Sequence, residues 1–210
     1  MPVRGGTFIQ GYNAQNVTSA DGLIIATRLT AGTNDAPWLE PMLAAALAAA
    51  ARITAARPGA PQYTAPDGTV SPVGLLLADA GYLSARNLTL KGPDRLIATG
   101  KARDLEKAAR HAAGTSGNDR SGGEADPAGA IAAMTARLAT PEGIAAYRRR
   151  SHIAETPHGQ IKHNMRFRQL TLRGTPRATA EWTLACTAHN LFKALTAGKL
   201  TPAALTALAT

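Results

Sequence analysis

The clearest indication of the chain's architecture is an apolar run that ends in an acid, Val73-Gly74-Leu75-Leu76-Leu77-Ala78-Asp79-Ala80-Gly81-Tyr82. A continuous apolar run of this length is typical of a strand buried on both faces, as in the parallel part of an α/β sheet. Asp79 follows the run at once, and ligands of open α/β sheets bind where such strands end. The run therefore predicts a buried strand with a carboxylate at the rim of a sheet. Taken alone, Asp79 is more often an ordinary turn residue.

Three further strands are expected around this run. Residues 7–17 and 22–30 are joined by a turn that contains Asp21-Gly22, a dipeptide typical of hairpins. Residues 95–99 are mostly apolar and predict a second buried strand. Residues 58–72 are rich in Pro, Gly and Thr, which indicates a loop.

The first helix is expected over residues 35–56, with Asp35 as its cap and an Ala/Leu run as its body, and residues 83–90 predict a shorter one. After Gly100 the composition changes. Residues 102–113 predict a charged helix, and residues 114–129 contain Gly, Ser and Asp with almost no apolar side chains, which is typical of a flexible insertion.

The last part of the chain is expected to be helical. Residues 131–138 resume a helix, and Thr140-Pro141-Glu142 predicts the start of a long helix that extends to Lys162. Residues 178–196 predict an amphipathic helix. Its large apolar side chains are available for burial: Trp182, Leu184, Leu191 and Leu195. Strands, then alternating strands and helices, then helices indicate a mixed α/β domain.

Most of the positive charge lies in one stretch. The 210 residues carry 23 Lys and Arg against 14 Asp and Glu, a net charge of +9. Residues 141–177 hold eight of the basic residues and two of the acids, and therefore six of the nine net charges. A clustered basic surface is typical of proteins that bind phosphate backbones, although a solvated helix surface has the same composition.

Several other classes of protein are excluded by composition. A single cysteine, Cys186, rules out a disulfide framework and a Cys-cluster zinc site, and favours a reducing compartment. His152, His158 and His163 do not share one helix face, so no zinc site is expected. The longest apolar run, residues 42–51, is about half of a membrane span, so no membrane protein is indicated.

Short motifs follow one another along the chain: Gly11-Tyr12-Asn13-Ala14-Gln15, Leu77-Ala78-Asp79-Ala80-Gly81-Tyr82, Tyr147-Arg148-Arg149-Arg150 with Glu155, Gly159-Gln160-Ile161-Lys162, Phe167-Arg168-Gln169-Leu170 and Leu172-Arg173-Gly174. In order and spacing they resemble the DDE-domain transposases of bacterial insertion sequences, which are mobile elements. The resemblance covers nearly the whole chain. It implies an RNase H-like fold, in which helices flank a mixed sheet, and an enzyme that cuts and joins DNA strands.

The resemblance also assigns roles to individual residues. Asp79 matches the second catalytic acid and Glu155 the third, and both would hold the metal, two Mg²⁺ or Mn²⁺ ions. Lys162 would contact a terminal phosphate, with Tyr147 and Arg150 supporting the site. The other residues expected to bind DNA are Arg148, Arg149, Arg166, Arg168 and Arg173. Pro157 follows Glu155 closely and is expected to interrupt the helix hydrogen bonds there.

One member of the catalytic set has no match. The family's first catalytic Asp lies upstream of the Gly-Tyr-Asn motif, and no acid precedes Tyr12. Asp21 and Asp35 are the nearest acids, but they match no catalytic motif. We therefore expect an N-terminally truncated, C-terminal portion of a transposase, weak or inactive alone in DNA transposition.

Two alternatives stay open. In the first, the chain is a non-catalytic DNA-binding remnant that competes with or regulates a full-length transposase. In the second, it is a product that does not fold stably, because a sheet lacking its first strand exposes an unpaired edge. Expected partners are DNA, both transposon ends and target DNA, and a full-length transposase or a second copy of the chain. The expected location is the bacterial cytoplasm, at the nucleoid when DNA is bound.

The sequence predicts four segments. Residues 1–100 form the strand-rich part of the RNase H-like domain, and residues 101–135 a helical and flexible insertion, whose flexible part lies near 101–130. Residues 136–198 form the C-terminal catalytic helix region of the same domain, and residues 199–210 a tail.

Overall fold

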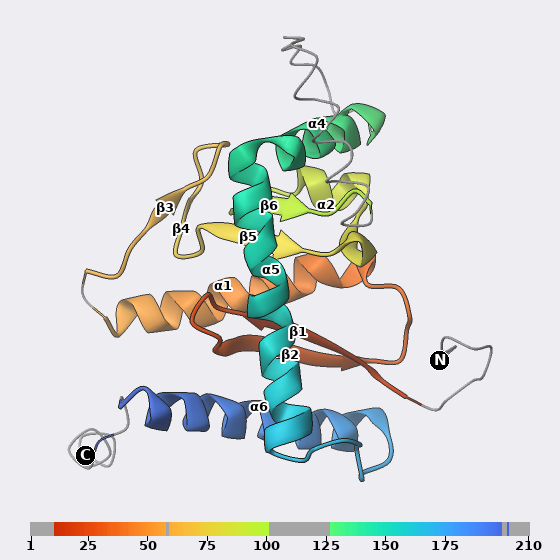
Figure 1. Ribbon diagram of the computed structural model, residues 1–210, viewed down its shortest axis with the longest axis vertical. Helices are drawn as coiled ribbons and strands as arrows, with labels where there is room; N and C mark the ends of the chain where they lie inside the picture. The colour runs from red at the N-terminus through yellow and green to blue at the C-terminus, as the bar shows by residue number, and fades with distance from the viewer. Residues whose placement is uncertain (1–10, 58, 101–126, 199–200, 202–210) are drawn as a thin grey trace. The chain divides into compact units, whose positions relative to one another are not determined.

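The computed structural model describes residues 11–57, 59–100, 127–198 and 201 (Figure 1). The chain divides into two compact units, unit 1 from Met1–Thr33 with Ser151–Thr210, and unit 2 from Asn34–Arg150. The described residues contain strands and α-helices in both units, which confirms the mixed α/β class. The described strands form three separate two-stranded sheets. The single mixed sheet expected of an RNase H-like fold is not seen in this part of the chain. No helix of the described part has an apolar stretch long enough to cross a bilayer.

Unit 1 begins with the predicted hairpin. Strand β1 (Asn13–Thr18) pairs antiparallel with β2 (Ile24–Thr30), with Asn13 opposite Thr30 and an irregularity at Val17/Thr18. In the turn, the Gly22 N–H donates to the Ser19 carbonyl at 2.8 Å. Gly22 has a φ of 85°, a conformation in which a Cβ would be strained, and this is why the turn requires glycine.

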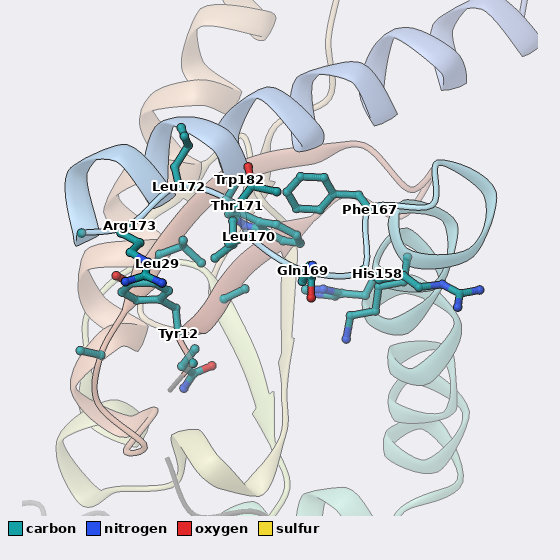
Figure 2. A pocket seen from close by; sticks show the side chains of 17 residues that line it. Tyr12, Leu29, His158, Phe167, Gln169, Leu170, Thr171, Leu172, Arg173 and Trp182 are labelled. Atoms are coloured by element: carbon teal, nitrogen blue, oxygen red, sulfur yellow. The ribbon is translucent and has the colours of Figure 1, made fainter. Parts of the chain in front are cut away.

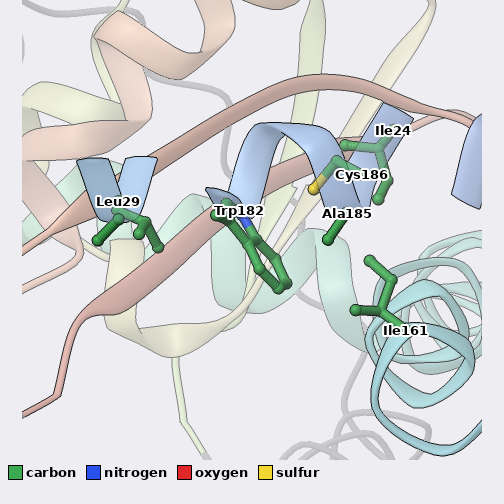
Figure 3. Packing of buried hydrophobic residues seen from close by; sticks show 7 residues of the cluster. Ile24, Leu29, Ile161, Trp182, Ala185 and Cys186 are labelled. Atoms are coloured by element: carbon green, nitrogen blue, oxygen red, sulfur yellow. The ribbon is translucent and has the colours of Figure 1, made fainter. Parts of the chain in front are cut away.

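Helix α6 (Thr175–Thr196) packs on β2. The side-chain amide of Asn190 completes the hydrogen bonding of the strand, accepting from the Ile24 N–H at 2.9 Å and donating to the Ile24 carbonyl at 2.8 Å. Trp182 Nε1 donates to Thr27 Oγ1 at 2.8 Å. Figure 3 shows the core between these elements, which consists of Ile24, Leu29, Ile161, Ala178, Trp182, Ala185 and Cys186.

Of the four α6 side chains expected to be available for burial, Trp182 is buried as predicted, but the prediction is wrong for the three leucines. Leu184, Leu191 and Leu195 are 69%, 52% and 54% exposed. The buried face of α6 instead carries Trp182, His189 and three small side chains. The small side chains are Ala178, Ala185 and Cys186. Small residues let the helix backbone approach the hairpin closely, and the leucines are left on the other side.

Unit 2 is built around a parallel strand pair. Strand β5 (Leu75–Ala78) pairs with β6 (Asp94–Ile97), with Leu75 opposite Asp94 and Ala78 opposite Ile97. The apolar run therefore forms a strand, as predicted, and Asp79 directly follows its last residue, Ala78. Leu75 is exposed, however, so the strand is not buried on both faces along its whole length.

Helices and a second hairpin surround this pair. Helices η1 (Ala36–Trp38) and α1 (Leu39–Ala55) precede the hairpin β3 (Tyr63–Thr64) and β4 (Val70–Ser71), and η2 (Ala80–Tyr82) and α2 (Ala85–Thr89) follow β5. The hairpin lies in the predicted loop 58–72, which is therefore not wholly irregular. Asp35 is the N-cap residue of η1, as predicted, but its side chain makes no cap bond, and Asn34 Oδ1 accepts from the Ala36 N–H at 3.1 Å instead.

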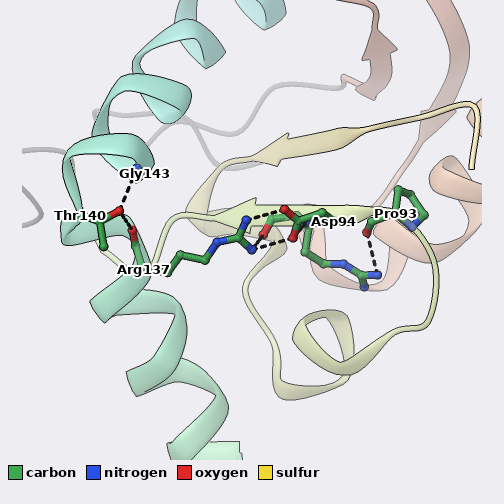
Figure 4. A network of polar contacts seen from close by, with 6 residues as sticks. Pro93, Asp94, Arg137, Thr140 and Gly143 are labelled. Atoms are coloured by element: carbon green, nitrogen blue, oxygen red, sulfur yellow. Dashed lines mark hydrogen bonds and ion pairs between the residues drawn. The ribbon is translucent and has the colours of Figure 1, made fainter. Parts of the chain in front are cut away.

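Helix α4 (Pro127–Ala139) leads into the long helix α5 (Pro141–Gly159). Residues 101–126 of the predicted insertion lie outside the described residues, and residues 127–130 are already helical. The predicted restart at Thr140 is confirmed, because Thr140 Oγ1 accepts from the Gly143 N–H at 3.0 Å. Arg137, in the last turn of α4, forms an ion pair with Asp94 and donates to the Arg95 carbonyl at 3.2 Å (Figure 4).

This ion pair fixes the charge of the Asp94 carboxylate at the start of β6. Burial raises its pKa, but the hydrogen bond and positive charge of Arg137 outweigh burial, so the net pKa is lowered. Arg95 donates in turn to the carbonyls of Asn87 and Pro93, at 2.9 and 3.2 Å. The junction of α4 and α5 is thereby attached to the strand pair.

We expect Gly143→Ala to destabilise unit 2, because a Cβ there would lie 2.0 Å from the Arg137 carbonyl oxygen. Overpacking of this kind costs about 1–3 kcal/mol. Gly159→Ala is the matched control: a Cβ at this helical glycine meets nothing within 4 Å, and stability should rise by about 0.4–1 kcal/mol. Chemical unfolding followed by circular dichroism measures both. Equal stability of the two variants would contradict the close contact at the α4–α5 junction.

Candidate functional site

The end of strand β5 holds a carboxylate in a fixed position. Asp79 directly follows the strand, and its Oδ1 accepts from the Gly81 N–H at 2.9 Å, which caps η2. The preceding carbonyl, that of Ala78, accepts from the Ala98 N–H at 3.1 Å. The rim carboxylate predicted from the apolar run is therefore present, with its backbone tied to the neighbouring strand.

A second carboxylate lies beside Asp79. A Cβ built on Gly81 would lie 2.7 Å from Asp35 Oδ2 and 3.1 Å from Asp79 Oδ1, so the two side chains flank this glycine. Both carboxylates act on Tyr82, whose pKa is raised first by burial and then by the charges of Asp35 and Asp79. Two acids far apart in the sequence thus meet at the carboxyl end of β5.

Sequence reasoning missed Asp35. Its position before a Pro-containing helix start suggested a cap, and nothing in the spacing from Asp35 to Asp79 indicates that they meet. The available signal was Gly81, because a residue without a side chain after a strand-end acid indicates that another group approaches closely.

Tyr147 approaches the same strand end from α5. Its Oη donates to the Ala78 carbonyl at 3.2 Å, and the Arg150 Cζ lies 5.8 Å from the centroid of its ring. Burial raises the pKa of Tyr147, Arg150 opposes this shift, and Asp79 adds to it. Tyr147, predicted to support the site, is therefore brought to the peptide that precedes Asp79, and Arg150, also predicted to support it, lies against the Tyr147 ring.

Helix α5 also carries the other predicted residues of the YRRR motif and Glu155. Arg148, Arg149 and Glu155 are exposed. Glu155 belongs to unit 1 and Asp79 to unit 2. The catalytic and metal-binding roles of Asp79 and Glu155 stay predictions.

Three predicted DNA-binding residues line one pocket in unit 1, which has a volume of about 1350 Å³. They are Lys162, Arg168 and Arg173. Figure 2 shows the pocket between the hairpin, α6 and the loop that joins η3 to α6. None of the lining residues is acidic, so the pocket is suited to an anion. Arg166, also predicted to bind DNA, is exposed and does not line it.

Lys162 lies in a short π-helical segment that follows α5 and lines the pocket. Pro157, which is fully buried inside α5, has no N–H to donate, as expected from the sequence. Two residues later the chain enters the π-helical turn η3 (Gln160–Asn164), in which the Met165 N–H donates to the Gln160 carbonyl at 3.1 Å. Arg166 then takes a φ of 56°, which is rare for a residue with a side chain, and turns the chain into the pocket loop.

The loop is held on α6 by Glu181. Its two carboxylate oxygens accept from the Thr171 N–H at 2.9 and 3.0 Å, from Thr171 Oγ1 at 2.7 Å and from the Leu172 N–H at 2.9 Å. These bonds lower the pKa of Glu181. They fix the backbone between Arg168 and Arg173, so Glu181 is a positioning residue that the sequence did not reveal.

His158 forms part of the pocket floor. Its ring stacks on Trp182, with centroids 5.7 Å apart and an angle of 19° between the planes. Burial lowers the pKa of His158, and the charges of Lys162 and His189 lower it further. Both effects favour the neutral form of the imidazole. Within the described ranges, no three His, Cys, Asp or Glu side chains are grouped so that they could hold a metal ion.

Residues 124–195 match the model of a family described as a transposase DDE domain. The matched segment includes α4, α5, η3 and all but the last residue of α6, and with them Glu155 and Lys162. No curated protein and no solved structure matched the chain.

We expect the hydrogen bonds that hold the loop between Arg168 and Arg173 on Glu181 to weaken at acid pH. Because the pKa of Glu181 is lower in the folded protein, its stabilising effect is complete above the ordinary glutamate pKa and is lost as the pH falls through the lowered value. The amide signals of Thr171 and Leu172 should therefore titrate in NMR spectra at acid pH. Glu181→Gln should shift them at neutral pH, whereas Glu142→Gln should not. Unchanged signals in Glu181→Gln would contradict the anchoring role.

Proposed function

We propose that this chain, whose residues 124–195 belong to a transposase DDE domain, takes part in DNA transposition by metal-dependent cleavage and transfer of DNA strands at transposon ends. One observation carries the proposal. The matched segment supplies Glu155 and the cationic side chains, and Asp79 stands at the carboxyl end of β5, where a catalytic acid of this family is expected.

The end of β5 supplies two carboxylates, which is fewer than a complete set of metal ligands but is the kind of ligand that a divalent metal prefers. Carboxylate oxygens are the ligands that Mg²⁺ and Mn²⁺ prefer, and Asp35 and Asp79 present two carboxylates on either side of Gly81. In the proposal, Asp79 and Glu155 hold the metal as the resemblance implies, and Asp35 assists Asp79. A bound divalent ion would neutralise charge on the phosphate and activate the attacking oxygen.

The chain's own residues would orient the DNA. The Gly81 N–H fixes Asp79 Oδ1, and the Tyr147 hydroxyl fixes the peptide before it. The cations would bind phosphate oxygens, with Lys162 at a terminal phosphate. The remaining members of this set are Arg148, Arg149, Arg150, Arg166, Arg168 and Arg173.

We also propose that the fold is RNase H-like. The antiparallel hairpin β1–β2 and the parallel pair β5–β6 are the two kinds of strand pairing that its mixed sheet contains. The proposed segments remain residues 1–100 for the strand-rich part, 101–135 for the insertion, 136–198 for the catalytic helix region and 199–210 for the tail.

A second candidate function is DNA binding without catalysis, by a chain that competes with or joins a full-length transposase. The pocket of unit 1 favours it, because its three cations are grouped with no acid among the lining residues. Such a site binds phosphates whether or not the carboxylates of unit 2 hold a metal.

DNA binding is tested by its dependence on salt. Arg148→Ala/Arg149→Ala removes two exposed cations, so the slope of log K against log[salt] should fall by about 1.8. Arg52→Ala/Arg57→Ala removes two exposed cations outside residues 141–177 and should leave the slope unchanged. Fluorescence anisotropy with a labelled duplex measures both. A salt-independent affinity would contradict the basic DNA-binding surface.

The two candidate functions are separated by measuring strand cleavage of the same duplex, extended with the inverted repeats that flank the coding sequence, after Mg²⁺ or Mn²⁺ is added. Strand cleavage that disappears in Asp79→Asn, with DNA affinity retained, supports the transposase. Salt-sensitive binding with no cleavage supports the non-catalytic candidate.

A further inference from the structure

Helix α6 exposes large apolar side chains on the side opposite the hairpin. Leu184, Leu191 and Leu195 are each more than half exposed, and the neighbouring Phe192 is 59% exposed. Because their positions are seven and four residues apart, the three leucines form one row along the helix. We propose that this leucine row is the contact surface of a homodimer, in which α6 packs antiparallel against α6 of a second copy of the chain.

The inner face of α6 is already covered, so the leucine row needs a cover of its own. Ala178, Trp182 and Ala185 are buried in the core of unit 1, where the helix packs on β2. A helix that is apolar on two sides is normally covered on both, because an exposed apolar row is unfavourable in water. Hydrogen bonds between Asn190 and the Ile24 peptide hold the helix on the strand, so the row is presented on a fixed support.

The leucine row contains no charged side chain. The charged side chains of α6 are Arg177, Glu181 and Lys193. Both Glu181 oxygens bind the pocket loop, and Lys193 Nζ would lie 2.9 Å from a Cβ built on Gly22, at the hairpin turn. Arg177 precedes the row, in the first turn of the helix. Because the net charge of +9 opposes association, two copies meet most readily on a face where no like charges come together.

The order of side chains along the row favours an antiparallel pair. In that arrangement Leu184 of one copy lies opposite Leu195 of the other, and Leu191 lies opposite the smaller Ala188. The same face then meets itself across a two-fold axis, which is the commonest symmetry of dimers. Arg177 lies beyond the C-terminal end of the second helix, where the carbonyl groups carry partial negative charge. A parallel pair would instead bring the two Arg177 side chains together.

The polar groups beside the row can be buried without loss of hydrogen bonds. Thr183 Oγ1 donates to the Thr179 carbonyl at 2.8 Å, and Thr187 Oγ1 donates to the Thr183 carbonyl at 2.9 Å. Both threonines are exposed, and their hydroxyl donors are satisfied within the helix. A second copy that covers them therefore leaves no unpaired hydroxyl donor.

The exposed apolar area is large enough to contribute to a stable dimer. Four side chains that are more than half exposed present roughly 400 Å² of apolar surface, the size of the patches that mark interaction sites. In a dimer, these side chains alone would supply about half of the roughly 1,200–2,000 Å² of a standard interface. The exposed threonines beside the row add to this area.

Sedimentation velocity of the full chain, purified free of nucleic acid, tests the proposal. We expect a concentration-dependent equilibrium between monomer and dimer. Leu191→Glu places a charge in the row and should raise the dimer dissociation constant about 30-fold or more, the effect of a central interface residue. Ile53→Glu is the matched control: Ile53 is also 52% exposed but lies on α1, and the dissociation constant should stay unchanged. Circular dichroism checks that both variants are folded.

Disulfide cross-linking tests the direction of the pair, in a Cys186→Ala background that removes the native thiol. A mixture of Leu184→Cys and Leu195→Cys chains should form cross-linked heterodimers when it is oxidised with copper phenanthroline. Either chain alone should not cross-link, because identical positions away from the middle of an antiparallel pair lie far apart. Cross-linking of Leu184→Cys chains with one another would overturn the antiparallel direction.

Two results would overturn the dimer surface itself. A dimer that Leu191→Glu leaves intact would show that the contact lies elsewhere. A chain that stays monomeric at every concentration would exclude the dimer, and NOE contacts from the leucine methyl groups to residues 199–210 would then identify the chain's own C-terminal segment as the cover. Neither result bears on the proposed DNA binding, because the contact requires neither DNA nor a metal.

Discussion

One peptide carbonyl connects the parts of unit 2 on which the proposed chemistry depends. The Ala78 carbonyl, the last of strand β5, accepts both the Ala98 N–H and the Tyr147 hydroxyl, at 3.1 and 3.2 Å. The adjacent strand and helix α5 are therefore attached to the peptide that precedes Asp79. Asp79 in turn has one oxygen fixed by Gly81. A carboxylate held in this way needs little rearrangement to bind a metal, which is what a site acting on phosphodiesters requires.

Unit 1 is organised by a different constraint, the close packing of α6 on the hairpin. Small side chains at Ala178 and Ala185 permit this approach, and Trp182 and Asn190 use hydrogen bonds to fix its register on β2. Glu181 then uses the same helix to hold the pocket loop. The cations of the pocket are thereby placed by packing and backbone hydrogen bonds and need no acidic partners among the lining residues, so their charge is available to a phosphate.

The local features of the chain could be predicted from its sequence, and its tertiary contacts could not. The strand before Asp79, the turn at Gly22 and the cap at Thr140 each depend on neighbouring residues and agree with the prediction, although the burial of that strand on both faces does not hold at Leu75. Asp35 was missed because its approach to Asp79 depends on how η1 lies against η2. The leucines of α6 were assigned to the core because an apolar pattern shows which residues are hydrophobic but not which face a hairpin covers.

We propose that the carboxyl end of β5 is the metal centre of a DNA-processing site. Paramagnetic broadening of amide NMR signals by substoichiometric Mn²⁺ tests it most directly, with no DNA and no catalysis required. We expect the signals of Ala80, Gly81 and Tyr82 to broaden first, Asp79→Asn to abolish this broadening and Asp35→Asn to weaken it. Broadening centred elsewhere, or unaffected by Asp79→Asn, would contradict the claim.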